Sequence, residues 1–567
     1  MSNVLLSEHS RPGSTDAPAH ENGGQLLVHL LKEAGVDTVF GIISVHNLPL
    51  VEEVAKELRF VPVRHEASAV NAADGYARAS GKLGCALTST GTGAGNAAGS
   101  LIESLSSATS VLHITGQVES RYVGSGRAFI HETKDQLGML QAVSRAAFSI
   151  GTADEAEPVL RRAIELATDA VGGPVSVEWP INLQYASVSG PGVTADLPLP
   201  ATPVAPAEEE LAAALEQLKK AQRPLIWAGG GAARNPENRE LLTQLCELWP
   251  VGVITSNSGR GCLPEDHPRV IGNYGATPTG RALLGEADCL LTLGTHFRSN
   301  ETGDYSVAMP ANHVQVDQDP AAVGRVYPVS AGVTGDITAF LNYLLTHAAE
   351  LGGDPDWASA STAAREKARR VQREGLGDHE EFADAIAEVF PAGSPIARDV
   401  TIASSSWGNR LLPIHRPESN IFPRGGGIGQ GLGMALGAAL ADPDVPTLAI
   451  VGDGGLAVHF GELLTLAQEN PWLVLLVFND GGYGVLRNMQ HGQDKPGSAV
   501  DLHTPEFAGL AGALGLAYSR IDDRASVRPV LADAVAARQA ILVEVDLAAY
   551  GDMNQAFTPP VTVPGKE

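Results

Sequence analysis

Two acidic residues in glycine-rich turns are the side chains of this sequence best suited to holding a metal ion. Asp453 lies within Gly452-Asp453-Gly454, directly after an apolar run, and Asp480 follows a second apolar run one strand–helix–strand unit later. If both runs are parallel strands, the two carboxylates meet at the carboxyl edge of one sheet, where open α/β sheets bind ligands. Two carboxylates and a loop carbonyl, such as that of Gly482, suit Mg²⁺ or Ca²⁺.

The glycines around these two carboxylates suit a second ligand, a diphosphate. Without side chains, their backbone N–H groups can approach the phosphate oxygens closely. Two unrelated glycine turns after strands would give a similar pattern. The combination with the carboxylates nevertheless predicts a metal-bound diphosphate at this edge of the sheet.

Glu66 is a third candidate for chemistry, far away in the sequence. It follows the predicted strand 60–64 and begins a predicted helix, so its carboxylate should face a sheet edge. A partly buried carboxyl can hold or share a proton. It could equally stabilise the start of its own helix.

These motifs resemble the cofactor-binding motifs of thiamine diphosphate (ThDP) enzymes. In that family, Gly-Asp-Gly followed by Asn-Asn or a close variant anchors the diphosphate; here Asp480 stands at the usual asparagine, which keeps an oxygen ligand and adds negative charge. The context Arg64-His65-Glu66-Ala67, with Asp74 to Arg78 downstream, is similar to the pyrimidine-domain signature. The resemblance covers the chain from about Gly24 to Tyr550.

The resemblance implies roles for individual residues. Glu66 would bond N1′ of the aminopyrimidine and promote the imino tautomer that removes the C2 proton, while Asp453, Asp480 and the Gly482 carbonyl would bind Mg²⁺. Ile428 would hold ThDP in its V shape, and the Gly426 carbonyl would accept from the 4′-amino group. The other residues assigned to cofactor binding are Ser404, Ser405, Gly452, Gly454, Gly455 and Tyr483. The two serines could instead cap a helix.

Candidates for contact with the substrate lie in the first part of the chain. Gln117 resembles the glutamine beside the cofactor in acetolactate-synthase-like members, and His46 stands where members place polar residues near the substrate; His131 and Glu132 lie on a loop that could approach. Each could equally be an ordinary core or surface residue. The adjacent histidine pair of pyruvate decarboxylases is absent from the first domain, and Val45 replaces the serine of benzoylformate decarboxylases.

The segment after the metal motif should supply further polar groups. Residues 483–493 should start as a helix and hold no carboxylate. An amide can orient a hydroxyl but cannot accept its proton. Either His491 is therefore the base, or Gln490 and Gln493 only orient the substrate while the base comes from elsewhere, or the chain lacks an efficient base at this point. We favour Gln493 as a substrate-facing residue; it could also be a solvated loop glutamine.

Length and composition restrict the class of protein. The 567 residues allow three or four domains, and the net charge of −26 argues against nucleic acid or an anionic membrane as partner. The four cysteines are scattered, which favours buried free thiols over a disulfide framework. We find no signal peptide or membrane-length apolar run and expect a cytoplasmic protein.

The elements that position these residues alternate between strands and helices, which predicts an α/β fold with three doubly wound parallel-sheet domains. The middle domain is Rossmann-like, but its run Gly229-Gly230-Gly231 is not GxGxxG, so it could bind adenosine diphosphate (ADP), flavin or nothing. The expected parts are a disordered stretch (1–23), a pyrimidine-binding domain (24–186), a middle domain (207–346), a diphosphate- and Mg²⁺-binding domain (379–550) and a tail (551–567) that is either disordered or a lid.

Among ThDP enzymes, the chain looks most similar to the actinobacterial 2-hydroxyacyl-CoA lyases, the 2-hydroxyisobutyryl-CoA lyase type. That resemblance implies reversible cleavage of a 2-hydroxyacyl-CoA to formyl-CoA and a ketone or aldehyde. The alternative is a 2-oxo acid decarboxylase or an acetolactate synthase-like carboligase. A non-catalytic ThDP-binding subunit would not need Glu66 and both metal carboxylates. The resemblance also implies a homodimer as the smallest active unit, within a homotetramer.

Overall fold

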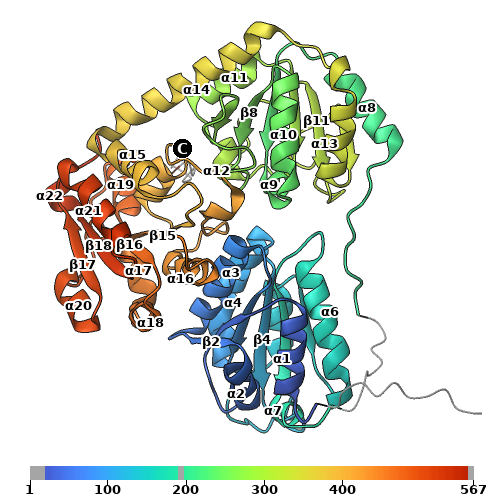
Figure 1. Ribbon diagram of the computed structural model, residues 1–567, viewed down its shortest axis with the longest axis vertical. Helices are drawn as coiled ribbons and strands as arrows, with labels where there is room; N and C mark the ends of the chain where they lie inside the picture. The colour runs from blue at the N-terminus through green and yellow to red at the C-terminus, as the bar shows by residue number, and fades with distance from the viewer. Residues whose placement is uncertain (1–19, 189–196, 560–567) are drawn as a thin grey trace, which may run out of the picture.

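Residues 20–188 and 197–559 are described in the computed structural model, and they form three six-stranded sheets surrounded by helices (Figure 1). Every paired strand in these sheets runs parallel to its neighbours. Parallel strands need crossover connections, and helices supply most of them. The architecture confirms the predicted α/β fold with three parallel sheets.

The first sheet has the strand order β2-β1-β3-β4-β6-β5. Its strands are β1 (Thr38–Gly41), β2 (Arg59–Pro62), β3 (Gly84–Thr88), β4 (Val111–Gln117), β5 (Ala146–Ser149) and β6 (Val175–Pro180). Its helices are α1 (Gly23–Glu33), α2 (Leu48–Glu57), α3 (Glu66–Ser80), α4 (Thr92–Ser107), α5 (Gln136–Val143), α6 (Ala156–Thr168) and α7 (Ile181–Gln184). The central strands β3 and β4 are buried along their whole length, as in parallel sheets covered on both faces.

The middle sheet has the order β12-β11-β10-β7-β8-β9, which is the order of a Rossmann fold. Its strands are β7 (Pro224–Ala228), β8 (Gly252–Thr255), β9 (Val270–Gly272), β10 (Cys289–Leu293), β11 (Asn312–Asp317) and β12 (Ala331–Thr334). Its helices are α8 (Glu208–Leu218), α9 (Gly230–Arg234), α10 (Glu237–Leu248), α11 (Pro278–Glu286), α12 (Ser299–Thr302) and α13 (Ile337–Thr346).

The third sheet, β14-β13-β15-β16-β18-β17, carries the metal motif. Its strands are β13 (Ile396–Arg398), β14 (Asn420–Ile421), β15 (Thr447–Gly452), β16 (Leu473–Asn479), β17 (Ala517–Ile521) and β18 (Ile541–Asp546). Its helices are α15 (Glu380–Val389), α16 (Gly431–Ala441), α17 (Asp453–Leu456), α18 (Glu462–Glu469), α19 (Gly484–His491), α20 (Phe507–Leu514), α21 (Arg524–Ala536) and α22 (Leu547–Tyr550).

The first and third domains pack through α3 and α16, which lie against each other (Figure 1). Small residues permit the close approach. A Cβ atom on Gly75 would lie 2.0 Å from the Met434 carbonyl oxygen, and one on Gly437 would lie 1.8 Å from the Ala72 carbonyl oxygen. Larger side chains at either glycine would therefore push the two domains apart.

A long helix connects the middle and third domains. The charged segment 352–378 contains one helix of 22 residues, α14 (Pro355–Leu376), which spans the distance between the two domains (Figure 1). Asp354 caps it by accepting from the Asp356 N–H, and Trp357 anchors it by donating to the Pro224 carbonyl. Capping and one buried face thus override the polar composition.

The predicted disordered stretch at the N-terminus is too long at its inner end. Residues 1–19 lie outside the described part of the chain, but Gly23 and Gly24 already belong to α1 and are buried. Asn22 caps this helix by accepting from the Gln25 N–H. Gly23 also packs against Trp179, where a Cβ atom would lie 2.4 Å from the indole ring. A cap and a tertiary contact outweigh the low helix propensity of two glycines.

The described part of the tail lies against the third domain. The Gln555 N–H donates to the Gly375 carbonyl at the end of α14, and Asn488 in α19 donates to the Phe557 carbonyl at 3.0 Å. Residues 560–567 lie outside the described part. The tail therefore reaches the helix that follows the metal motif.

The four cysteines are free and buried, as predicted. Among the described residues, no helix is long and apolar enough to cross a membrane.

Candidate active site

The two carboxylates of the metal motif lie side by side at the carboxyl edge of the third sheet. Asp453 begins α17 after β15, and Asp480 follows β16. These strands are neighbours, with Gly452 level with Phe478. The Asp480 N–H donates to Asp453 Oδ1 at 3.4 Å. Strand pairing therefore brings together two residues that are distant in the sequence.

The state of these carboxylates fits a bound cation. Asp453 is only 1% exposed, and its Oδ2 atom and Oδ1 of Asp480 are buried without a hydrogen-bond partner. Burial raises the pKa of both carboxyls; for Asp480, burial and then the Asp453 charge raise the pKa to about 6. Buried, mutually repelling carboxylates with free oxygen atoms are stabilised by a divalent cation.

The remaining ligands of such a cation would have to be oxygen atoms other than carboxylates. Among the described residues, no group of three His, Cys, Asp or Glu side chains could hold a metal ion. The Gly482 carbonyl is close: it would lie 2.7 Å from a Cβ atom on Gly454, and the Tyr483 ring would lie 2.9 Å from that atom. Glycine is therefore required at 454, and backbone can approach a ligand there.

The glycine-rich turn that precedes α16 lies beside the metal motif. Asp399 accepts hydrogen bonds from the Gly429 and Gly431 N–H groups at 3.1 and 3.2 Å. Ile428 is 40% exposed although it is a large apolar residue. Gly426 has φ +89°, which few other residues adopt without strain. The turn is therefore held by Asp399 and presents one unburied apolar side chain.

The two serines of the predicted diphosphate site lie in a π-helical turn, Ser404–Gly408, after β13. The Ser404 hydroxyl is buried without a hydrogen-bond partner, which leaves it able to donate to a ligand. The Ser405 N–H donates to the Thr401 carbonyl. Gly455 lies nearby, with a would-be Cβ atom 3.4 Å from Asp399 Oδ2.

Glu66 occupies the first position of α3 and is 9% exposed. The His65 side chain caps this helix by accepting from the Ala67 N–H at 3.2 Å. Glu66 Oε2 accepts from the Asn96 amide of α4 at 3.0 Å. The carboxylate is thus held by one side-chain hydrogen bond at a helix start, as the sequence placed it.

The Gln117 side chain belongs to a buried polar network at the end of β4. Its Nε2 donates to Glu178 at 3.1 Å, and its Oε1 accepts from the Val118 N–H at 2.8 Å. Gln136 donates to the same Glu178 carboxylate. Both ends of the Gln117 amide are therefore engaged within the protein.

His46 lies beside this network and pairs with His131. The two rings are 5.2 Å apart in an edge-to-face arrangement, and both ring nitrogens of His46 are buried without a partner. Burial, and then the His131 charge, lowers the pKa of His46. Spatial pairing thus joins two histidines that are not adjacent in the sequence, and each is available for a ligand.

The segment after the metal motif forms α19, a helix close to the predicted one. His491 ends this helix and is exposed. Gln493 lies in an exposed turn, where its Oε1 accepts from Lys495 at 2.6 Å. The structure does not bring either residue against Glu66 or Asp453.

Sequence reasoning did not identify Asp399, which supports the glycine-rich turn. Asp399 follows directly on the strand β13, and an acidic residue at the end of a strand was the signal used for Asp453. The same signal could have found it. Asn96, in contrast, is recognisable only from its contact with Glu66.

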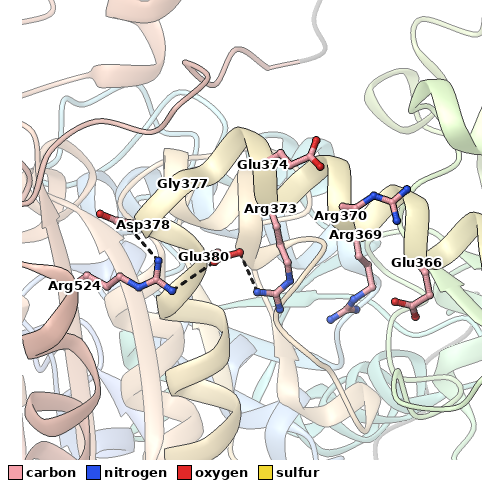
Figure 2. Close-up of a pocket in the computed structure, with 9 residues that line it drawn as sticks. All are labelled: Glu366, Arg369, Arg370, Arg373, Glu374, Gly377, Asp378, Glu380 and Arg524. Atoms are coloured by element: carbon pink, nitrogen blue, oxygen red, sulfur yellow. Dashed lines mark hydrogen bonds and ion pairs between the residues drawn. The ribbon is translucent and has the colours of Figure 1, made fainter.

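A pocket of about 680 Å³ lies elsewhere, where α14, α15 and α21 meet (Figure 2). Charged side chains and one glycine line it. Arg373 and Arg524 are ion-paired there with Glu380, and Arg524 also with Asp378. These ion pairs link the three helices.

Comparisons with known proteins match three separate regions of the chain. Residues 21–139 match the "Thiamine pyrophosphate enzyme, N-terminal TPP binding domain", 211–344 the central domain and 402–545 the C-terminal TPP binding domain of the same family. Thiamine pyrophosphate is another name for ThDP.

Curated relatives cover most of the chain. A probable 2-ketoarginine decarboxylase of Pseudomonas aeruginosa is 32% identical over 504 residues, 88% of this chain and 89% of that protein. A probable acetolactate synthase large subunit of Methanocaldococcus jannaschii is 28% identical over 92% of this chain and 91% of its own length. The acetolactate synthase isozyme 2 large subunit of Escherichia coli is 28% identical over 90% of this chain and 92% of its own.

The edge of the third sheet offers oxygen ligands for a metal-bound diphosphate, the first domain offers a carboxylate at a helix start, and the three matched regions occur in the family's order. The chain belongs to the thiamine pyrophosphate enzyme family.

Proposed function

We propose that this protein is a ThDP- and Mg²⁺-dependent carbon–carbon lyase that breaks the bond next to a carbonyl group. The observation that carries the proposal is the buried carboxylate pair with free oxygen atoms at the edge of the third sheet. Such a pair needs a cation, and a cation there provides an anchor for a diphosphate. When bound, ThDP supplies the electron sink for the electrons left by bond cleavage.

In this proposal the third domain holds the cofactor. Asp453, Asp480 and the Gly482 carbonyl bind Mg²⁺, and Ser404 donates to the diphosphate. Burial raises the pKa of these carboxyls and so favours their protonated form. The charge of a bound cation has the opposite effect, so both carboxylates would stay ionised at neutral pH. Ile428 supports the pyrimidine ring, which explains why so large an apolar side chain is left unburied.

The first domain supplies the proton chemistry. Glu66 holds a proton at N1′ of the pyrimidine, and its hydrogen bond from Asn96 fixes the direction of its carboxylate. His46 and His131 face the substrate. A histidine with a lowered pKa is neutral at pH 7 and can accept a substrate proton.

The groups of the two domains meet when a second copy of the chain is present. Along α4, Gly95 and Gly99 face open space, and Ile102 on the same face is 48% exposed. A helix face of small residues with one exposed apolar side chain suits close packing against another helix. We therefore propose a homodimer as the smallest active unit, in which Glu66 of one chain faces Asp453 of the other, and a homotetramer as the complete assembly.

The substrate class that the relatives favour is a 2-oxo acid. One relative is described as a 2-ketoarginine decarboxylase, and two are acetolactate synthases. Decarboxylation needs an electron sink, which bound ThDP would supply, and a proton for the product carbon, which a histidine that has accepted a proton could return.

The second candidate is cleavage of a 2-hydroxyacyl-CoA. Arg234, Arg298 and Arg424 lie where the three domains meet and bond only to backbone carbonyls among the described residues. Burial, and then the Arg78 charge, lowers the pKa of Arg424 to about 9. Unpaired guanidinium groups suit the phosphates of a CoA thioester. The central domain by itself gives no reason to assign ADP.

A substrate panel separates these candidates. The purified protein is incubated with ThDP, Mg²⁺ and a series of 2-oxo acids or 2-hydroxyacyl-CoAs, and CO₂ and formyl-CoA are measured. CO₂ from a 2-oxo acid supports the decarboxylase, and formyl-CoA supports the lyase. Acetolactate-type products without either preference would indicate a carboligase. No turnover of any compound by ThDP-loaded protein would contradict the proposed function.

A further inference from the structure

Helix α4 contacts two groups to which the proposed function gives a role at a pyrimidine: Glu66, which serves one site of the proposed dimer, and the glycine-rich turn of the same chain, which serves the other site. Near its start, Asn96 donates to Glu66. Two turns later, Glu103 reaches across to the glycine-rich turn of the third domain. Residues two turns apart lie on the same side of a helix. A single helix therefore fixes a carboxylate of one domain and a backbone turn of another.

The contact made by Glu103 is specific to this turn. Its Oε2 accepts from the Gly425 N–H at 2.6 Å and its Oε1 from the Gly427 N–H at 2.9 Å. Glu103 is only 3% exposed. A Cβ atom on Gly425 would lie 2.5 Å from Glu103 Oε1, so only glycine leaves room for the carboxylate. The two N–H groups flank Gly426, whose carbonyl is the proposed acceptor for the 4′-amino group.

We propose that Glu103 is a positioning residue that sets the glycine-rich turn before the cofactor binds. The inference rests on the proposed function, because it assigns the turn to the pyrimidine. Three consecutive glycines, Gly425 to Gly427, have more conformational freedom than any other tripeptide. Two hydrogen bonds to an ionised carboxylate are strong restraints. Asp399 holds the other end of the turn, so carboxylates from two domains restrain it.

A turn that is already in place lowers the entropy lost on binding. It also keeps the Gly426 carbonyl and Ile428 in register with each other. Loss of Glu103 should therefore weaken ThDP binding and slow activation of the bound cofactor. Loss of domain packing alone would act differently, since it would lower stability without any special effect on the cofactor.

A matched control for domain packing is available. Glu469 of α18 forms an ion pair with Arg59 of β2 at 2.8 Å. It links the same two domains as Glu103 but does not touch the turn. Glu469→Gln therefore removes an inter-domain carboxylate contact and leaves the proposed machinery intact.

The experiment compares Glu103→Gln, Glu103→Ala and Glu469→Gln with the wild type. Gln keeps one acceptor oxygen and places an amide N–H against the second backbone N–H, so it should lose at least one bond. The measurements are the Kd of ThDP in excess Mg²⁺ by calorimetry, the melting temperature without ThDP, and hydrogen–deuterium exchange at C2 of bound ThDP.

We expect Glu103→Gln to raise the Kd about tenfold and to slow C2 exchange, with a larger effect in Glu103→Ala. Glu469→Gln should keep the wild-type Kd of ThDP and the wild-type rate of C2 exchange. Wild-type Kd and exchange in Glu103→Gln would overturn the inference, as would equal changes in Glu103→Gln and Glu469→Gln. If Glu103→Ala does not fold, Glu103→Gln decides. Failure of the wild type to bind ThDP would instead refute the proposed function itself.

Discussion

The first and third domains have the same strand order but carry different chemistry at the same edge. Numbered within each domain, both sheets run 2-1-3-4-6-5. The second strand leads to Glu66 in one domain and to the glycine-rich turn in the other. The fourth strand leads to Gln117 in one and to Asp480 in the other. Equivalent positions of one scaffold therefore hold different groups.

The two domains differ in whether their buried polar side chains have hydrogen-bond partners. In the first domain, Gln117 and Glu178 are joined in a buried hydrogen-bonded network. In the third domain, Asp453 and Asp480 keep buried oxygen atoms without hydrogen-bond partners, and Arg487 lies 3.8 Å from Oδ1 of Asp480. A satisfied network fixes geometry, whereas unsatisfied carboxylates require a ligand. Under the proposed function, cofactor binding and proton chemistry are thus divided between two domains with the same strand order.

The largest expected effect comes from removing a carboxylate of the third domain. Asp453→Ala should abolish activity and cofactor binding, because Mg²⁺ loses a ligand. At a ThDP concentration of about 100 times Kd, the wild type should gain about 2.7 kcal/mol of stability, and the variant none. Calorimetry and thermal unfolding with and without ThDP and Mg²⁺ measure this.

The control for that variant is Asp444→Ala, which removes an exposed carboxylate of the same domain. Without Mg²⁺, Asp453→Ala should unfold no earlier than the wild type, since it relieves repulsion with Asp480. Tight ThDP binding by Asp453→Ala would show that the metal site has been assigned to the wrong residues.

The equivalent change in the first domain should separate binding from activation. Glu66→Gln should still bind ThDP but exchange the C2 proton about 10² to 10⁴ times more slowly, the usual contribution of a general acid–base group. Glu52→Gln, an exposed change in the same domain, is the control. Nuclear magnetic resonance of acid-quenched samples measures the exchange, and an unchanged rate would remove Glu66 from the mechanism.

The two sheets should also differ in their response to acid. His113 is fully buried in β4, bonded to Thr88 and Ser176, whereas β16 carries only apolar residues before Asn479. Burial lowers the pKa of His113 from 6.5 to about 3. At a pH between these two values, the unfolded chain therefore binds a proton at this residue and the folded chain does not. The contribution of His113 to the free energy of unfolding is lost as the pH falls from 6.5 towards 3.

We expect His113→Gln to reduce the loss of stability below pH 6.5 by up to about 1.4 kcal/mol per pH unit. Urea unfolding at several pH values measures it, with His503→Gln, an exposed histidine of the third domain, as control. Identical pH profiles for His113→Gln and the wild type would mean that His113 is protonated in the folded protein.

The smallest effect should come from the tail. Deleting residues 557–567 removes the contact between Asn488 and the Phe557 carbonyl beside α19. If the tail covers the substrate, KM should rise several-fold or intermediates should divert to side products, with ThDP affinity unchanged. Steady-state kinetics of the truncated protein, with calorimetry as a control for ThDP binding, would show no change if the tail is not a lid.

Local signals in the sequence were sufficient for the fold and for the metal motif. Apolar runs that end in Gly452 and Asn479 predict buried parallel strands, and strand pairing then places Asp453 beside Asp480. The contact of Glu103 with the glycine-rich turn could not be predicted, because it joins residues from different domains. The exposed position of Gln493 depends on Lys495 and on the irregular path after α19, for which periodicity gives no information.

The central claim is that one site uses Glu66 of one chain and Asp453 of another, and mixed dimers test it most directly. Differently tagged Glu66→Gln and Asp453→Ala chains, each inactive alone, are co-expressed and purified through both tags. Such a dimer has one site with both residues intact and one with neither. We expect this sample to regain about half of the wild-type activity per dimer and to bind one ThDP tightly. If a dimer that contains both chains recovers no activity, each site belongs to a single chain, and the proposal of a site shared between two chains is wrong.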